Sequence, residues 1–390
     1  MITYERRTDV RNESASPVTV VGAGPAGLAC AIALARAGRH VVVREWHRDV
    51  GMRFHGDFQG LENWSDEQDV LDELAAVGIQ TSFEHHAVSQ GTVYDSRGDS
   101  YSIQSRQPLF YLLRRGTGEG SLDHSLLRQA LAAGVDVRLG ERASVALGTT
   151  VLAIGPRRAD AIAVGYVFDS GLPNGAWLIL DNDLAPLGYA YLLIYGGRGT
   201  VAACLFTGFK HQQEYLNRTV TAFRERVDLE MRNPRPFGGF ANFRLPRTAM
   251  QGGHPVIGEQ AGFQDALAGF GMRYAIRSGL LAARSILDDV DYTILWRREL
   301  QPLLRAGTVN RFLFNLIGER GRRTAARALS RRDTRLVLRR FYRPSMLSRF
   351  LFPLARFRYR APLRDRSCDH VDCHCVWCQC QTDLQATAVH

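Results

Sequence analysis

The chain has 390 residues, of which 45% are hydrophobic and 23% charged, which is typical of a globular protein. No apolar run predicts a membrane span, and residues 1–16 are polar and lack the core of a signal peptide. We therefore expect a cytoplasmic protein with a disordered N-terminus over these residues. The net charge of +10 comes from residues 320–366, where sixteen arginines stand against two aspartates. Because the charge is confined to one segment, the net charge says nothing about the active site.

A glycine-rich turn organises the first part of the chain. Residues 18–21 are β-branched and predict a strand, and residues 22–27 then read Gly-Ala-Gly-Pro-Ala-Gly. Residues 28–37 predict a helix, and residues 40–44 predict a second buried strand that ends at Glu45. This order predicts a βαβ unit with the G-x-G-x-x-G pattern of dinucleotide-binding folds.

Each glycine of this pattern has a physical role. Gly22 permits the tight turn, Gly24 lets the backbone approach a pyrophosphate, and Gly27 lets the helix pack close to the strand. The N–H groups at the positive end of the helix would then face the anion. Glu45 stands eighteen positions beyond Gly27, where an acidic side chain can bind the hydroxyls of an adenosine ribose.

The next segments alternate loops, helices and strands. Residues 46–60 are rich in glycine and polar residues and predict a loop beside the cofactor. The side chains of this loop that could face the cofactor are Arg53, His55, Asp57 and Gln59. Helices are predicted over residues 65–77, with Ser65 as N-cap, and over 121–133; a hairpin over 92–95 and 100–104; and strands over 108–115, 135–139 and 149–155.

The character of the sequence changes between residues 159 and 247. Alternating and aromatic runs separated by turn signals predict an antiparallel sheet, interrupted by a helix over residues 213–231. The predicted strands of this sheet cover residues 162–168, 176–180, 189–195 and 200–206. A second glycine-rich turn then follows a short strand at residues 255–262, and residues 271–287 predict a long helix.

Taken together, the two glycine-rich turns, Arg114 and Gly155 resemble the FAD-dependent p-hydroxybenzoate hydroxylase-like superfamily, and within it most closely the geranylgeranyl reductase family. The resemblance covers residues 18–287. It implies an α/β fold, with a Rossmann-like FAD-binding domain (a parallel sheet with helices on both faces) and an inserted antiparallel-sheet substrate domain. Beyond it we expect a helical C-terminal segment. The boundaries that we expect are 17–158 and 248–290 for the two parts of the FAD-binding domain, 159–247 for the substrate domain, 291–366 for the basic helical segment and 367–390 for a Cys/His-rich tail.

The resemblance also assigns residues to the cofactor. Glu259 stands where the family has the acid that binds the flavin ribityl chain, and residues 269–272 match the turn whose N–H groups face the isoalloxazine. Either Arg114 or Arg115 matches the family's cofactor-contacting arginine. Together with the first turn, Glu45 and Arg53, the full set of expected FAD-binding residues is Gly22, Gly24, Pro25, Ala26, Gly27, Glu45, Arg53, Arg114, Gly155, Gly258, Glu259, Gly269, Phe270, Gly271 and Met272.

The expected activity is reduction of C=C bonds in an apolar, isoprenoid-like substrate by hydride transfer from reduced flavin. The electron donor is either NADPH or a ferredoxin-like protein. Tyr189 and Tyr191 either line the substrate channel or pack in the sheet. An FAD-dependent monooxygenase or halogenase is the alternative, but the Asp-Gly motif of the aromatic hydroxylases is absent near Gly155 and no Trp-x-Trp-x-Ile motif of halogenases is visible.

Residues 339–360 interleave arginine with aromatic and aliphatic side chains, which is typical of peripheral contact with an anionic membrane. The alternative is a helical subdomain with solvated arginines. Pro344 and Pro353 are expected to break any single long helix. No motif supports nucleic-acid binding.

The C-terminal tail concentrates five of the seven cysteines. Its thiols and imidazoles match the ligands of zinc or another soft metal. The candidate ligands are Cys368, His370, Cys373, His374, Cys375, Cys378 and Cys380. A redox relay is the alternative, and a flavin-bearing metal-binding or redox-sensing protein is the corresponding function. Cys30 and Cys204 are expected to be inert buried thiols.

Overall fold

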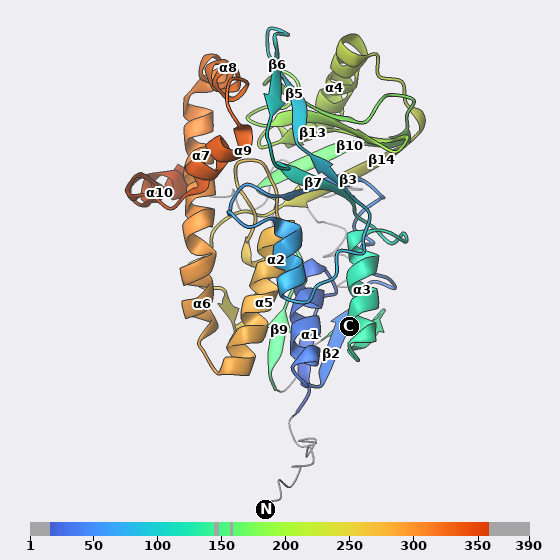
Figure 1. Cartoon of the computed structure of the whole chain (residues 1–390), viewed down its shortest axis with the longest axis vertical. Coiled ribbons are helices and arrows are strands. Elements are labelled where there is room, and N and C mark those ends of the chain that lie inside the picture. Colours follow the sequence, from blue (N-terminus) through green and yellow to red (C-terminus); the bar gives the residue numbers. More distant parts are fainter. Residues whose placement is uncertain (1–15, 144–147, 157–158, 359–390) are drawn as a thin grey trace, which may run out of the picture.

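The computed structural model describes residues 16–143, 148–156 and 159–358. Figure 1 shows a parallel sheet with its helices at one end of the long axis and a larger, mainly antiparallel sheet at the other, with the C-terminal helices along one side. The predicted Cys/His-rich tail and residues 1–15 of the predicted disordered segment lie outside the described residues. The predicted α/β fold class is confirmed.

The first glycine-rich turn belongs to a four-stranded parallel sheet. In spatial order its strands are β8 (Asp136–Leu139), β2 (Val41–Glu45), β1 (Val18–Val21) and β9 (Thr150–Leu152). All neighbouring strands pair in parallel, which confirms the predicted βαβ unit. Val256 forms a parallel bridge to Leu152, so the second glycine-rich turn begins beside the β9 edge of the same sheet.

Helices α1 (Pro25–Arg36) and α3 (Leu122–Ala132) pack on this sheet, and α5 (Met272–Asp288) packs against α1. Helix α1 contacts both α3 and α5. Most residues of α1 are buried, and they are small or aliphatic. A helix that is apolar on most sides can be packed between other elements in this way. Both α1 and α5 begin directly at a glycine-rich turn, so their N-termini meet at the same edge of the sheet.

The second large sheet has seven strands. In spatial order they are β14 (Arg232–Ala241), β10 (Ala161–Asp169), β13 (Arg198–Leu205), β12 (Tyr189–Tyr195), β11 (Gly175–Leu180), β5 (Gln90–Asp95) and β6 (Ser100–Gln104). Helix α4 (Gln212–Val227) covers one face by packing on β10 and β13 (Figure 1). Strand β14 was not predicted. The β5–β6 hairpin was predicted, but within the first part of the FAD-binding domain, residues 17–158. In the structure it joins the seven-stranded sheet instead, through parallel pairing of β5 with β11.

A smaller sheet and a short helix connect the two ends. The antiparallel sheet contains β3 (Phe58–Glu62), β7 (Phe110–Arg114) and β4 (His85–Val88), and the short helix is α2 (Val70–Ala76). The predicted loop over residues 46–60 is therefore wrong at its end, where pairing with β7 makes a strand. The predicted helix start at Ser65 is also wrong, because Asp69 caps α2 by accepting from the N–H of Leu71. Four short elements complete this part of the described chain. Strands β15 (Met250–Gln251) and β16 (His254–Pro255) form a minimal hairpin, and the 3₁₀ turns are η1 (Phe209–His211), before α4, and η2 (Gly258–Ala261), in the second glycine-rich turn.

The basic segment is helical as predicted, as far as the described residues reach. Its helices are α6 (Tyr292–Glu299), α7 (Gln301–Leu316), α8 (Gly318–Leu329), α9 (Thr334–Tyr342) and α10 (Met346–Arg358). Pro344 separates α9 from α10, but Pro353 lies inside α10 and does not end it. Within the described ranges, no helix is both long enough and apolar enough to cross a bilayer.

Candidate active site

One large cavity joins the regions of the fold. Its volume is about 920 Å³, towards the upper end of the roughly 300–1,000 Å³ that ligand pockets occupy. Its walls come from both glycine-rich turns, the loop after β2, the open face of the seven-stranded sheet, and helices α7, α8 and α9. The cavity therefore connects the predicted cofactor site with the predicted substrate region.

The first turn has the geometry that the glycine pattern predicts. Gly22 has a φ of +107°, and a Cβ there would lie 2.3 Å from the carbonyl oxygen of Ala153. A Cβ on Gly27 would lie 2.0 Å from the carbonyl oxygen of Gly22, so the helix could not approach the strand. Gly24 meets no atom within 4 Å and lines the cavity beside Pro25 and Ala26. Gly22 and Gly27 thus shape the turn, and Gly24 faces the cavity.

Glu45 is held at the rim of this turn. Its carboxylate accepts hydrogen bonds from the backbone N–H of Ala23 at 2.8 Å and of His47 at 3.0 Å. These bonds fix the side chain at the end of β2, where it lines the cavity. Each carboxylate oxygen keeps a further acceptor site for a hydroxyl group. Glu45 thus lies at the end of β2 beside the cavity, and its binding of ribose hydroxyls stays a prediction.

The predicted loop residues converge on the cavity. Arg53, His55, Asp57 and Gln59 all line it. Arg53 forms an ion pair of 2.6 Å with Glu259 of the second turn and donates to the carbonyl oxygen of Phe240 on β14. Gly155 lines the cavity close to Arg53. This arginine thus connects three segments that are far apart in the sequence.

The second turn is built around Asp265, a residue that the sequence analysis did not single out. Its carboxylate accepts from the N–H of Ala268 at 2.7 Å, and its own N–H donates to the carbonyl oxygen of Phe270. The ring of Phe270 packs edge-on against Trp64, with centroids 4.7 Å apart. These contacts fix the segment from Gly269 to Met272 along the cavity wall.

The N-terminus of α5 is open toward the cavity. Gly271 is its N-cap and supplies no side-chain hydrogen bond, so the first N–H groups of α5 remain available to a ligand. Gln264 lines the cavity and donates its amide to Gly269, while its buried Oε1 accepts from no atom of the described residues. Gly258 and Glu259 lie beside them.

Of the two candidate arginines after β7, the structure places only Arg115 in the cavity. Arg114 points elsewhere: its guanidinium pairs with Glu84 at 2.8 Å and donates to the carbonyl oxygen of Glu119. Arg115 is buried, lines the cavity and is held by Asp123 through two bonds of 2.8 Å. Neighbouring side chains on extended backbone point to opposite faces, which decides between the two. The predicted role of Arg114 is thus transferred to Arg115.

The sheet presents aromatic side chains to the other end of the cavity. On β12, Ala190 and Leu192 face the side covered by α4, so Tyr189 and Tyr191 face the cavity. Tyr189 donates its hydroxyl to the carbonyl oxygen of Ala268 in the second turn. Burial raises the pKa of both phenols well above the usual value. Both tyrosines therefore stay protonated at neutral pH.

Cys204 differs from the expectation of a thiol inside the core, because it lines the cavity beside Tyr189. Burial raises its pKa to about 11, although Tyr189 and Arg311 act to lower it. A protonated thiol is a poor nucleophile. The expectation of low reactivity is therefore kept, although Cys204 is only half-buried. Cys30 is fully buried, and burial raises its pKa to about 12.

The C-terminal helices supply an apolar wall. The larger cavity-facing apolar side chains of α7, α8 and α9 are Leu313, Phe314, Leu329, Val337, Leu338 and Phe341. Arg322 and Arg332 also line the cavity, and the guanidinium of Arg322 lies over the ring of Phe314 at 4.3 Å. The basic segment therefore contributes to the cavity wall, which its charge alone did not indicate.

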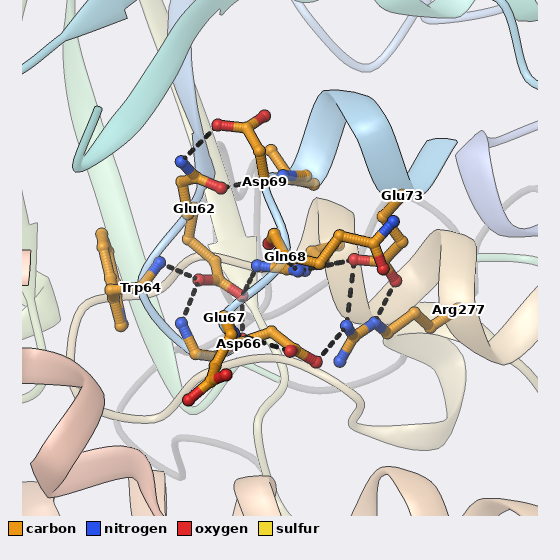
Figure 2. Close-up of polar contacts among 12 residues, drawn as sticks. Glu62, Trp64, Asp66, Glu67, Gln68, Asp69, Glu73 and Arg277 are labelled. Atoms are coloured by element: carbon orange, nitrogen blue, oxygen red, sulfur yellow. Dashed lines mark hydrogen bonds and ion pairs between the residues drawn. The ribbon is translucent and has the colours of Figure 1, made fainter. Parts of the chain in front are cut away.

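A polar network holds the β3–α2 connection against α5 (Figure 2). Glu62 is buried and accepts from the N–H of Trp64 at 3.0 Å. Glu73 pairs with both Arg273 and Arg277, and Arg277 also bonds Asp66 at 2.8 Å. Because both arginines follow the second turn on α5, the network fixes the direction in which α5 leaves the cavity.

No group of His, Cys, Asp and Glu side chains that could hold a metal ion exists among residues 16–143, 148–156 and 159–358. All seven predicted metal ligands, from Cys368 to Cys380, lie outside these ranges. The predicted metal site is thus neither confirmed nor contradicted by the structure.

Comparisons with known proteins agree with this architecture. Residues 20–63 match the family described as NAD(P)-binding Rossmann-like domain, which covers the first glycine-rich turn and β2. No curated protein sequence matches the chain significantly.

Solved structures of similar fold span most of the chain. A geranylgeranyl bacteriochlorophyll reductase-like protein from Thermoplasma acidophilum is 17% identical, with a TM-score of 0.64, over 87% of this chain and 95% of that one. A p-nitrophenol 4-monooxygenase from Pseudomonas putida is 13% identical (TM-score 0.58; 89% and 99% covered). A myxobacterial FAD-dependent halogenase, the chondrochloren halogenase, is 17% identical (TM-score 0.55; 90% and 98% covered). The chain thus shares the fold of a reductase-like protein, a monooxygenase and an FAD-dependent halogenase, which confirms the expected resemblance at the level of fold.

Proposed function

We propose that this protein is an FAD-dependent oxidoreductase that reduces C=C bonds of an apolar, isoprenoid-like substrate. One observation carries the proposal: a single cavity is lined at one end by two glycine-rich turns at helix N-termini and at the other by apolar side chains. Helix N-termini bind anionic and electron-rich groups, and apolar walls bind hydrocarbon chains.

The residues present fit FAD. The absence of a Cβ at Gly24 leaves open space that suits a pyrophosphate. The carboxylate of Glu45 is held where it suits the ribose hydroxyls. Glu259, held by Arg53, suits the ribityl chain. The N-terminus of α5 and the unpartnered buried Oε1 of Gln264 suit the polar edge of the flavin ring. Bound FAD would supply the hydride for reduction.

The other end of the cavity suits the proposed substrate. Side chains of α7, α8 and α9 form a largely apolar wall opposite the sheet, so that water is excluded from a bound chain. Alkene reduction also needs a proton. Tyr189 and Tyr191 face the cavity and hold their phenolic protons at neutral pH, because burial raises their pKa. The hydroxyl group of Tyr191 is the candidate proton donor, because the hydroxyl group of Tyr189 already donates to the carbonyl oxygen of Ala268.

The test is a single-turnover experiment without oxygen. FAD-loaded protein is reduced with dithionite, freed of excess reductant and mixed with geranylgeraniol under argon. We expect the flavin absorbance to return and the product to gain two hydrogen atoms per flavin, as measured by mass spectrometry. Dithionite removes the need to know whether NADPH or a ferredoxin-like protein is the natural donor.

Two results would change the assignment. Flavin reoxidation that requires oxygen and adds an oxygen or halogen atom to an aromatic substrate would support the monooxygenase or halogenase alternative. A folded protein that binds no FAD would contradict the proposal as a whole.

A further inference from the structure

Helix α10 carries apolar side chains on its solvent-exposed face as well as on the face that packs against the protein. It packs on α7 through a face that includes the buried Ser348, Phe352 and Ala355. Its outward face is also apolar, and Phe350 there is 83% exposed. The exposed apolar side chains of this face recur at helical spacing and include Met346, Leu347, Phe350 and Leu354. A surface helix normally turns polar residues outward, so this stripe marks a contact surface.

The charge around the stripe has one sign. Residues 334–358 contain seven arginines and no acidic residue. On α10, Arg349 and Arg358 are exposed and Arg356 is half-buried. The pKa of Arg305 on α7 is lowered by burial and by repulsion from Arg349, Arg297 and Arg356. An anionic partner would relieve this repulsion.

The same region contains an opening of the large cavity. Phe341, near the end of α9, and Ile317, between α7 and α8, both line the cavity and are exposed, at 59% and 44%. Phe341 stands only five residues before Met346, the first residue of α10. The cavity therefore reaches the surface close to the start of the apolar stripe.

From these observations we propose that α10 and the end of α9 dock on an anionic lipid bilayer. The apolar stripe enters the headgroup region and the flanking arginines bind lipid phosphates. Docking would place the opening at Phe341 against the bilayer, where an apolar chain can pass into the cavity without crossing water. Only this last point depends on the proposed function, because lipid binding itself requires no turnover.

The charges favour a lipid surface over a second copy of the chain. A symmetric contact of two such stripes would bring two arginine clusters together without acidic side chains from α9 or α10 to neutralise them. A bilayer rich in phosphatidylglycerol offers negative charge and an apolar interior at once.

The test is flotation of the full-length, FAD-loaded protein with vesicles of phosphatidylcholine, with and without phosphatidylglycerol. We expect binding only to the anionic vesicles, weakening as salt rises. The triple variant Arg349→Gln/Arg356→Gln/Arg358→Gln should bind roughly a hundredfold more weakly, at about fivefold per arginine. The double variant Phe350→Asp/Leu354→Asp should also lose binding.

Matched control variants distinguish binding through α10 from a general effect of removing positive charge or exposed apolar area. Arg232→Gln/Arg235→Gln removes exposed arginines from β14, on the other side of the molecule in Figure 1, and Ile294→Asp alters an exposed apolar residue of α6. Both controls should bind like the unchanged protein, and the folding of every variant is checked by circular dichroism.

Several outcomes would overturn the proposal. These are no binding to anionic vesicles, equal losses in the controls, or a dimer in solution that Phe350→Asp/Leu354→Asp converts to a monomer. Binding that appears only after removal of residues 359–390 would show that the chain covers the stripe itself. The FAD content of each sample is measured separately, so a failure of the proposed cofactor is distinguished from a failure of docking.

Discussion

At the scale of single residues, backbone space decides where the cofactor can bind. Gly24 has an extended backbone, with φ of −77° and ψ of 176°, which any residue can adopt. It is also the N-cap of α1, and no atom lies near the position of its missing Cβ. A side chain at Gly24 would thus be tolerated by the fold but would occupy the space that we assign to the pyrophosphate.

The substitution Gly24→Asp should therefore separate folding from cofactor binding. Aspartate is a good N-cap, so the apoprotein should keep its stability to within a few tenths of a kcal/mol. FAD affinity should fall more than tenfold, because the carboxylate would repel the pyrophosphate. Thermal unfolding and FAD titration measure the two effects. Gly171→Asp, at a position equally free of neighbours but outside the cavity, is the control and should bind FAD normally. Unchanged affinity in Gly24→Asp would place the pyrophosphate elsewhere.

Asp265 of the second turn makes the stability of the fold depend on pH. Burial raises the pKa of its carboxyl from 3.8 to about 6. The folded protein thus binds this proton more tightly than the unfolded chain does between about pH 4 and pH 6. The resulting stabilisation is complete below about pH 4 and is lost as the pH rises through about 6.

Asp265→Asn should remove this dependence, since an amide does not titrate. Between pH 4 and pH 7.5 the free energy of unfolding of the variant should gain on the order of 2 to 3 kcal/mol relative to the unchanged protein. Urea unfolding at intervals of one pH unit provides the comparison. Two parallel pH profiles would show that Asp265 does not titrate in this range.

At the scale of elements, α9 is held to the cofactor region by one buried arginine. Arg335 donates to the backbone carbonyl oxygens of Asn63, at 2.6 Å, and of Glu67, at 3.0 Å. Asp333 accepts from Ser105 on the connection that follows β6. A wall of the cavity is therefore attached to the β3–α2 connection that also supports Phe270.

Arg335→Met should loosen this attachment. The change leaves buried carbonyl groups without donors and should cost about 2 to 4 kcal/mol of stability. Limited proteolysis should then cut near α9 at lower protease concentrations. Arg340→Met removes an exposed arginine of the same helix and should change neither measurement. Equal effects of the two substitutions would refute the anchoring role.

Most elements could be predicted from the sequence because their signals are local. Each such signal lies within a few residues of the structure that it specifies. Examples are the glycines of the first turn, the alternating residues 189–195, and Gly78, which follows the end of α2. The start of α2 was predicted wrongly because Ser65 and Asp69 are both good caps. The Ser65 hydroxyl instead bonds Glu62 at 2.6 Å, a contact that depends on the fold of the β3–α2 connection.

At the scale of the whole molecule, the candidate site is an assembly of distant segments. The glycine-rich turns could be found because each has a fixed spacing. The apolar wall could not, since α7, α8 and α9 reach the cavity only through tertiary packing, and their arginine-rich sequence indicates a solvated surface. Membership of β5 and β6 in the seven-stranded sheet depends likewise on pairing with β11, more than eighty residues later.

The apolar wall can be tested without changing the cofactor end. Val337→Trp on α9 should fill part of the cavity and weaken geranylgeraniol binding at least tenfold, while FAD content stays the same. Leu336→Trp alters the neighbouring residue, which is 53% exposed and does not line the cavity, and should bind normally. Calorimetric titration of the FAD-loaded proteins gives both affinities. Equal binding by the two variants would mean that the chain occupies another surface.

The central claim is that the two glycine-rich turns together hold FAD. The most direct measurement is the amount of flavin per chain, determined from its absorbance after release from purified protein that has been incubated with FAD. We expect about one FAD per chain, with far less retained by Gly24→Asp. A folded protein that takes up no FAD, even at millimolar concentration, would contradict the account.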